Sequence, residues 1–170
     1  LVLAGAAGVS HAAFAPAVPN GPTALLSGTT LAADPTLAGT VIADTNGVFS
    51  GPSFGGTYRT RVVKRDDTAT LDFYYRITSY WDQLTAVPRV LRDFRVDDYA
   101  GCTTDVTWRP DGDPAPGPGQ VWQQAVRFPQ PQSSSDGINI SFADLVNGTP
   151  STFHTGDESY YALVRTDATA

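Results

Sequence analysis

The strongest constraint in this sequence is a strict two-residue alternation of side-chain polarity over residues 69–78, which read ATLDFYYRIT. The odd positions carry Ala, Leu, Phe, Tyr and Ile, whereas the even positions are mostly polar or charged. Successive side chains of a strand point to opposite faces of a sheet, so this spacing predicts a β-strand with one apolar and one polar face.

The preceding stretch, residues 57–65, is also rich in β-forming residues and alternates more loosely. Residues 66–68, Asp-Asp-Thr, separate the two stretches and predict a tight turn. We therefore expect a long antiparallel hairpin. Its polar face is expected to lie in water and carries Arg59, Arg61, Asp72 and Arg76.

Further short strands are predicted along the whole chain, separated by Gly- and Pro-containing turns such as Asn46-Gly47 and Asn147-Gly148. These strands are residues 39–43, 90–96, 102–109, 121–128, 138–142 and 160–165. A short helix is expected within residues 79–92. The pattern predicts an all-β fold, an antiparallel β-sandwich of jelly-roll or immunoglobulin-like type with about eight strands.

Composition limits the class of protein further. A chain of 170 residues with 41% hydrophobic residues can bury one domain core and is not a disordered protein. The net charge of −6 argues against nucleic acid and anionic membrane surfaces as partners. The one cysteine, Cys102, cannot form an internal disulfide bond and is expected to be a small buried side chain within a strand.

The first 18 residues contain no charged side chain. We divide the chain into an apolar N-terminal segment, residues 1–20, and a sandwich domain, residues 21–170. The segment has two interpretations: the apolar part of a secretion signal with a cut after Ala12, or a retained strand buried in a partner. It is too short and too rich in Gly and Ala for a membrane span. Both interpretations predict a secreted, extracellular or cell-surface protein.

Candidate chemistry is sparse. A Cys102–His154 dyad is conceivable but lacks any activating motif around it. Asp111 and Asp113 are weak calcium candidates that lack the spacing of a calcium loop, and zinc ligands are too few. No carboxylate pair for glycoside hydrolysis can be selected. We therefore expect no catalytic residue, no metal and no cofactor, and the protein is not expected to be an enzyme.

Aromatic side chains offer a different possibility, because exposed rings bind sugars and buried rings fill cores. Only Tyr74 is expected to point outward, on the polar face of the predicted hairpin. The aromatic residues considered for a sugar-binding face are Tyr74, Tyr80, Trp81, Tyr99, Trp108 and Trp122.

Three stretches resemble bacterial secreted proteins of the PEP-CTERM exosortase class. They are residues 56–78 (GTYRTRVVKRDDTATLDFYYRIT), 99–109 (YAGCTTDVTWR) and 161–169 (YALVRTDAT). The likeness covers residues 39–169 with order and spacing intact, although Cys102 stands where an aromatic residue is usual. It implies an extracellular β-sandwich with no assigned reaction. No Pro-Glu-Pro motif or C-terminal anchor helix follows, so sorting by an exosortase is not expected.

These observations favour a structural subunit of an extracellular filament or surface assembly, whose partners are copies of itself. An incomplete sandwich exposes a strand edge, and an apolar segment of a neighbour can add to that edge. The expected buried anchors are Leu1, Leu3, Val9, Phe14 and Val18. The alternative is a monomeric secreted surface or matrix protein that binds polysaccharide.

Overall fold

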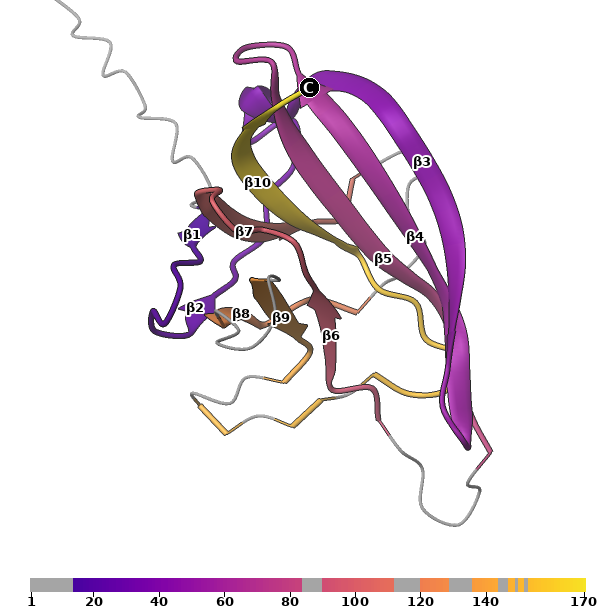
Figure 1. Cartoon of the computed structure of the whole chain (residues 1–170). Coiled ribbons are helices and arrows are strands. Elements are labelled where there is room, and N and C mark those ends of the chain that lie inside the picture. The colour runs from indigo at the N-terminus through magenta and orange to yellow at the C-terminus, as the bar shows by residue number, and fades with distance from the viewer. Residues whose placement is uncertain are drawn as a thin grey trace, which may run out of the picture.

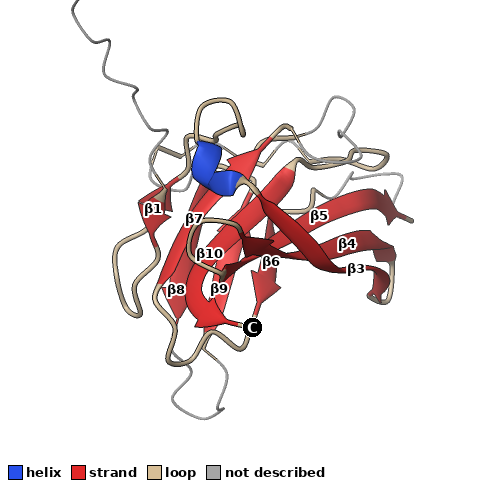
Figure 2. Cartoon of the chain, turned by 90° about the horizontal axis from the view of Figure 1, so that it is seen from above, coloured by secondary structure: helices blue, strands red, loops and turns tan. Residues whose placement is uncertain are grey.

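The computed structural model describes residues 14–83, 90–111, 120–128, 136–143, 147–148, 150–151 and 153–170. These residues form a β-sandwich of two antiparallel sheets, as the alternation and turn pattern predict, with six strands in one sheet and four in the other (Figure 1). Ten strands are present in the described chain, and its only helix is the 3-10 helix η1, Pro35–Leu37 (Figure 2).

The six-stranded sheet has the order β1-β7-β10-β5-β4-β3, and the four-stranded sheet has the order β2-β8-β9-β6. The strands of the large sheet are β1 (Ala15–Pro16), β3 (Gly39–Ser50), β4 (Phe54–Arg65), β5 (Thr70–Asp82), β7 (Thr104–Arg109) and β10 (Tyr161–Thr169). Those of the small sheet are β2 (Ala24–Leu25), β6 (Asp93–Val96), β8 (Gln124–Phe128) and β9 (Gly137–Ser141).

The predicted hairpin is confirmed as β4 and β5, which pair from Phe54–Asp82 to Lys64–Leu71. Two local predictions are wrong. Asn46-Gly47 is not a turn, because both residues lie inside β3 and pair with Arg59 and Tyr58 of β4. The helix expected within residues 79–92 is absent over residues 79–82, which continue β5 because they pair with the start of β4; residues 84–89 lie outside the described chain.

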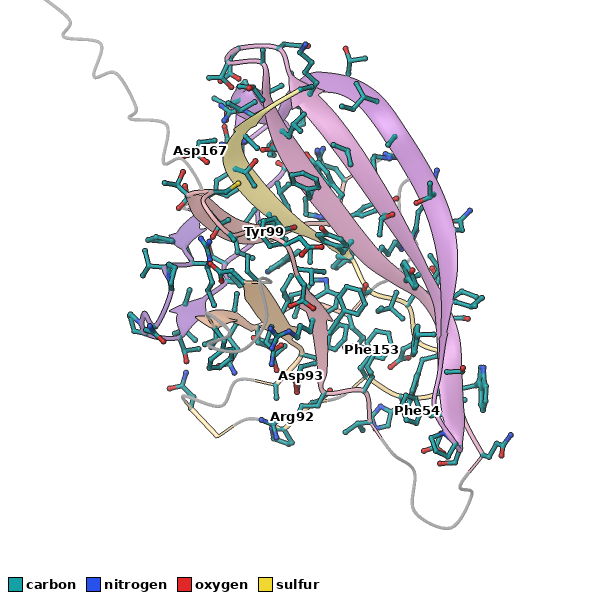
Figure 3. The ribbon with its side chains drawn as sticks, viewed as in Figure 1. Phe54, Arg92, Asp93, Tyr99, Phe153 and Asp167 are labelled. Atoms are coloured by element: carbon teal, nitrogen blue, oxygen red, sulfur yellow. The ribbon has the colours of Figure 1, made fainter. Side chains whose placement is uncertain are left out.

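The main core fills the space between the two sheets. The rings of Trp122, Phe142 and Phe153 stack in sequence, with centroids 3.9 Å and 4.2 Å apart. Tyr75 of β5 and Tyr99 share a hydrogen bond of 2.6 Å between their hydroxyl groups. Figure 3 shows Tyr99 and Phe153 inside the molecule, in the region between the sheets. Fully buried aromatic and β-branched side chains thus hold the sheets together.

A second apolar cluster lies on the opposite, outer face of the large sheet. Tyr161 and Leu163 of β10 point there, because Ala162 and Val164 point into the main core. Leu37 of η1 packs on Tyr74 and Val63 in this cluster. η1 begins after Asp34, whose carboxylate accepts the Thr36 N–H at 3.1 Å as an N-terminal cap.

The prediction that the polar face of the hairpin lies in water is therefore wrong for Arg61, Asp72 and Arg76, which are buried. Arg76 forms an ion pair with Glu158 and donates to the Ser159 carbonyl at 2.9 Å. Asp72 lies 3.4 Å from Arg165. Alternation correctly assigned these side chains to one face, but it could not reveal that distant parts of the chain cover that face.

Arg127 of β8 connects the two sheets. Its guanidinium donates to both carboxylate oxygens of Asp136 and to the Tyr99 carbonyl at 2.6 Å. It also donates to the Cys102 carbonyl at 2.8 Å and to the Thr104 hydroxyl of β7 at 3.0 Å. Cys102 itself lies half-buried before β7, outside any strand, so its predicted place inside a strand is wrong.

We predict that Arg127→Gln lowers the free energy of unfolding by about 3–5 kcal/mol, because it removes the charged partner of Asp136 and the donor to the Cys102 carbonyl, while the Tyr99 carbonyl keeps the Cys102 N–H. The matched control is Arg95→Gln, which removes an ion pair with Asp97 between two partly exposed side chains and should cost at most about 1 kcal/mol. Urea denaturation measures both. Equal losses in the two variants would contradict the connecting role of Arg127.

Candidate functional site

The free edge of the large sheet is the most distinctive surface of the molecule. β3 is the outermost strand, and within the described residues no strand pairs with its outer side. Figure 1 shows β3 at the right-hand margin of the sheet, beside β4. The strand is 12 residues long, so it presents an unusually long row of backbone groups for pairing.

The composition of β3 does little to prevent that pairing. Gly39–Ser50 contains no Lys, Arg or Pro, the residues that usually protect an edge. Asp44 is its only charged residue, and it is held by Arg59 at 2.6 Å and Arg61 at 2.8 Å. Val41, Ile42 and Val48 are 47%, 49% and 79% exposed. One protection exists, a register shift between Val41 and Ala43 that locally kinks the strand.

A pocket of about 350 Å³ opens beside the beginning of β3, between the segment that covers the outer face and the sheet itself. Val41 and Leu31 form its accessible rim, and both side chains are more than two-fifths exposed. Tyr74 and Tyr161 form its floor and meet edge to face, with centroids 5.9 Å apart. Gly39 and Val41 belong to both β3 and the pocket, so the pocket adjoins the beginning of the free edge.

The charged side chains of the pocket are already engaged with the protein. The Arg61 guanidinium lies 5.6 Å from the centre of the Tyr161 ring and pairs with Asp44. The Arg109 guanidinium lies 5.6 Å from the centre of the Tyr74 ring, pairs with Asp111 at 2.9 Å and donates to the Tyr74 hydroxyl at 3.2 Å. The Tyr161 hydroxyl has no partner among the described residues, but it is sealed from solvent.

The predicted assembly residues fall into two groups. Leu1, Leu3 and Val9 lie outside the described residues. Phe14 packs on the second apolar cluster, with the Arg165 guanidinium 3.9 Å from the centre of its ring. Val18 is exposed. The role of these five residues in assembly stays a prediction.

Residues 15–17 belong to the sandwich, whereas the sequence division placed them in a separate segment of residues 1–20. Ala15 and Pro16 form β1, which pairs with Val106 and Asp105 of β7. Ala17 is buried in the main core, and its carbonyl accepts the Thr104 hydroxyl at 2.7 Å. The apolar segment therefore enters the domain at the edge of the large sheet opposite β3.

The calcium candidates receive no support. The Asp111 carboxylate accepts the Leu31 N–H at 2.7 Å and the Arg109 Nε–H at 2.9 Å, so protein donors occupy both of its oxygens. Asp113 lies outside the described residues. Within the part of the chain that the structure describes, no three His, Cys, Asp or Glu side chains gather closely enough to hold a metal ion.

The Cys102–His154 dyad is excluded by distance along the sheet. Cys102 precedes Thr103, whose N–H donates to Asp167 near the end of β10. His154 lies in the turn before β10 begins, where Gly156 donates to the Tyr80 carbonyl. The two side chains therefore lie at opposite ends of β10, about 20 Å or more apart.

Most of the aromatic residues considered for sugar binding are core residues. Tyr74, predicted to point outward, does lie on the outer face but is buried beneath η1, so the prediction of an accessible ring is wrong. Tyr80, Tyr99 and Trp122 are buried in the main core, and Trp108 packs against it. Among the three tryptophans only Trp81 is exposed.

Comparison with known proteins gives no relative: no family model, no curated protein and no solved structure matches the chain. The fold therefore defines the protein only as an all-β sandwich. Among the described residues no helix has the length and apolar character needed to cross a membrane.

Two carboxylates near this site have pKa values shifted in opposite directions. Burial raises the pKa of Asp72, and the Arg165 charge opposes this effect only in part. The hydrogen bond from Arg59 lowers the pKa of Asp44, assisted by Arg61 and opposed by slight desolvation. The ordinary value for both groups is 3.8.

We predict opposite pH dependences for Asp72→Asn and Asp44→Asn. Because the pKa of Asp72 is raised in the folded state, the free energy of unfolding of the wild type declines as pH rises from 3.8 through that pKa. Asn does not titrate, so the free energy of unfolding of Asp72→Asn should rise relative to wild type across that window. Asp44 contributes stability above 3.8 that is lost as pH falls through its lowered pKa, so Asp44→Asn should be destabilising at neutral pH and less so in acid. Urea unfolding at about pH 3, 5 and 7 tests this; slopes of the same sign would contradict it.

Proposed function

We propose that this protein is a non-enzymatic structural subunit of an extracellular filament or surface assembly, in which the apolar N-terminal segment of one copy adds to the β3 edge of the next. The observation that carries the proposal is the long, free edge of β3, with no Lys, Arg or Pro along it. Backbone groups on such an edge pair readily with an added strand, and side-chain contacts then select the partner.

The positions of donor and acceptor favour an open polymer. The N-terminal segment joins the domain through β1, at one edge of the six-stranded sheet, and β3 forms the other edge. A contact that joins two different surfaces is heterologous and extends head to tail, unless rotation closes a ring. Copies linked in this way would continue the sheet from one subunit to the next.

Length and charge of the two partners are compatible. Thirteen extended residues span about 43 Å, and a 12-residue strand is about 40 Å long. Residues 1–18 carry no charge, so pairing along β3 buries no unpaired ion from the donor. The likeness of residues 39–169 to secreted bacterial proteins supports an extracellular location.

A truncation that removes residues 1–13 tests the proposal. We expect loss of polymers in electron micrographs and a single monomer boundary in sedimentation velocity, because the donor is gone. The cut must stop at residue 13, since Phe14 and Ala17 pack into their own domain. Circular dichroism and thermal melting provide the control that the truncated domain is folded. Polymers of unchanged length in the truncated protein would overturn the proposal.

Polysaccharide binding is retained as a second candidate because one aromatic side chain, Trp81 at the end of β5, is exposed beside Gly55 of β4. A flat ring of this kind can stack on a sugar. Saturable binding on a glycan array that is lost in Trp81→Ala, with the melting temperature unchanged, would favour this candidate. The assembly proposal expects no such binding.

A further inference from the structure

The pocket lies beside the beginning of β3, the free edge strand of the large sheet. Gly39 and Val41, the first and third residues of the strand, line it together with Leu31, Leu37 and Ala38 of the covering segment. A strand that pairs with β3 directs alternate side chains toward the outer face of the sheet, where this pocket opens. The pocket is therefore placed to receive a side chain from an added strand.

The lining determines which kind of side chain fits. The rings of Tyr74 and Tyr161 are almost fully buried, so they offer no open face for stacking a sugar or an aromatic ligand. Arg61 and Arg109 are already paired with Asp44 and Asp111, so an additional anion would have to displace these partners. What remains accessible is mainly aliphatic, on Leu31 and Val41, and this surface favours an uncharged aliphatic group.

We propose that the pocket receives Leu1 and Leu3 from the N-terminal segment of a second copy; this inference rests on the proposed function. Leu1 and Leu3 are two residues apart, so in an extended strand they lie on the same face. They are the only leucines among the first 18 residues, which are otherwise dominated by Ala, Gly and Val. The pair supplies the largest aliphatic surface that the segment can offer near its beginning.

The geometry points to a second copy because of where the segment leaves its own domain. β1 and β3 are five strand spacings apart in the sheet, or about 24 Å. A segment that returned to its own β3 would use part of its span of about 43 Å to cross the outer face, so too little would remain to follow the whole of the 12-residue strand. A neighbour that approaches edge to edge brings its segment directly to β3.

Disulfide trapping in the full-length chain tests this placement. In a Cys102→Ser background, Leu3→Cys is combined with Leu31→Cys, so that a bond forms only if the two residues meet. We expect a ladder of covalent oligomers on a non-reducing gel. The matched control pairs Leu3→Cys with Leu25→Cys, because Leu25 is 51% exposed and Leu31 is 43% exposed, and Leu25 lies in the other sheet. The control should give no ladder.

The outcomes separate the two proposals. A cross-linked monomer without a ladder would overturn the second copy as occupant. No excess of cross-links over the control, together with loss of polymers on removal of residues 1–13, would overturn the pocket and leave the proposed function standing. Polymers that persist without residues 1–13 would overturn both.

A milder substitution gives a quantitative check without cysteine chemistry. Leu31→Gln should raise the critical concentration for assembly by about tenfold or more, because one buried leucine contact is lost, whereas Leu25→Gln should leave it within about twofold. The Leu31→Gln effect should vanish in a Leu3→Ala background, since the contact is then already absent. Equal effects of Leu31→Gln and Leu25→Gln would overturn the assignment.

Discussion

The structure depends on the burial of charge on the outer face of the large sheet. Arg61, Arg76 and Arg109 lie there between the rings of Tyr74 and Tyr161, and each is paired with an acidic side chain. A buried ion pair is tolerated only when its remaining hydrogen bonds are made, and η1 with its flanking residues completes the cover. Both faces of the sheet are thus occupied at their centre by the chain itself, so pairing with a partner is directed to the edge.

A second group of hydrogen bonds, centred on Arg127, holds the small sheet against the large sheet. By joining β8 to the turn around Tyr99 and Cys102 and to Thr104, it fixes the small sheet against the edge where β1 pairs with β7. The same Thr104 hydroxyl donates to the Ala17 carbonyl. This chain of hydrogen bonds fixes the place where the apolar segment enters the domain, far across the sheet from β3. The N-terminal segment therefore leaves the domain at the β1 edge, and β3 is free at the opposite edge of the same sheet.

Sequence patterns predicted the class of fold because alternation is a local property. The β4–β5 hairpin and the strands after it could be found from residue spacing and turn residues. Spacing failed at β3, where Asn46 and Gly47 resemble a turn but are held in a strand by pairing with β4. Residue spacing also failed to predict that Tyr74 and Asp72 are buried, because the side chains that pack on them lie about 35 to 95 positions away in the sequence. The pocket could not be predicted for the same reason: Leu31, Val41, Arg109 and Tyr161 meet only in the folded chain.

By itself the sequence determined an all-β sandwich, an uncharged N-terminal segment and a content of only two histidines and one cysteine, because these depend on composition and on neighbours along the chain. Only the tertiary structure decided which strand has a free edge, which charged residues are buried and where the segment joins the sheet. Strand order and burial are set by pairing and packing between residues distant in sequence, and no local pattern encodes them.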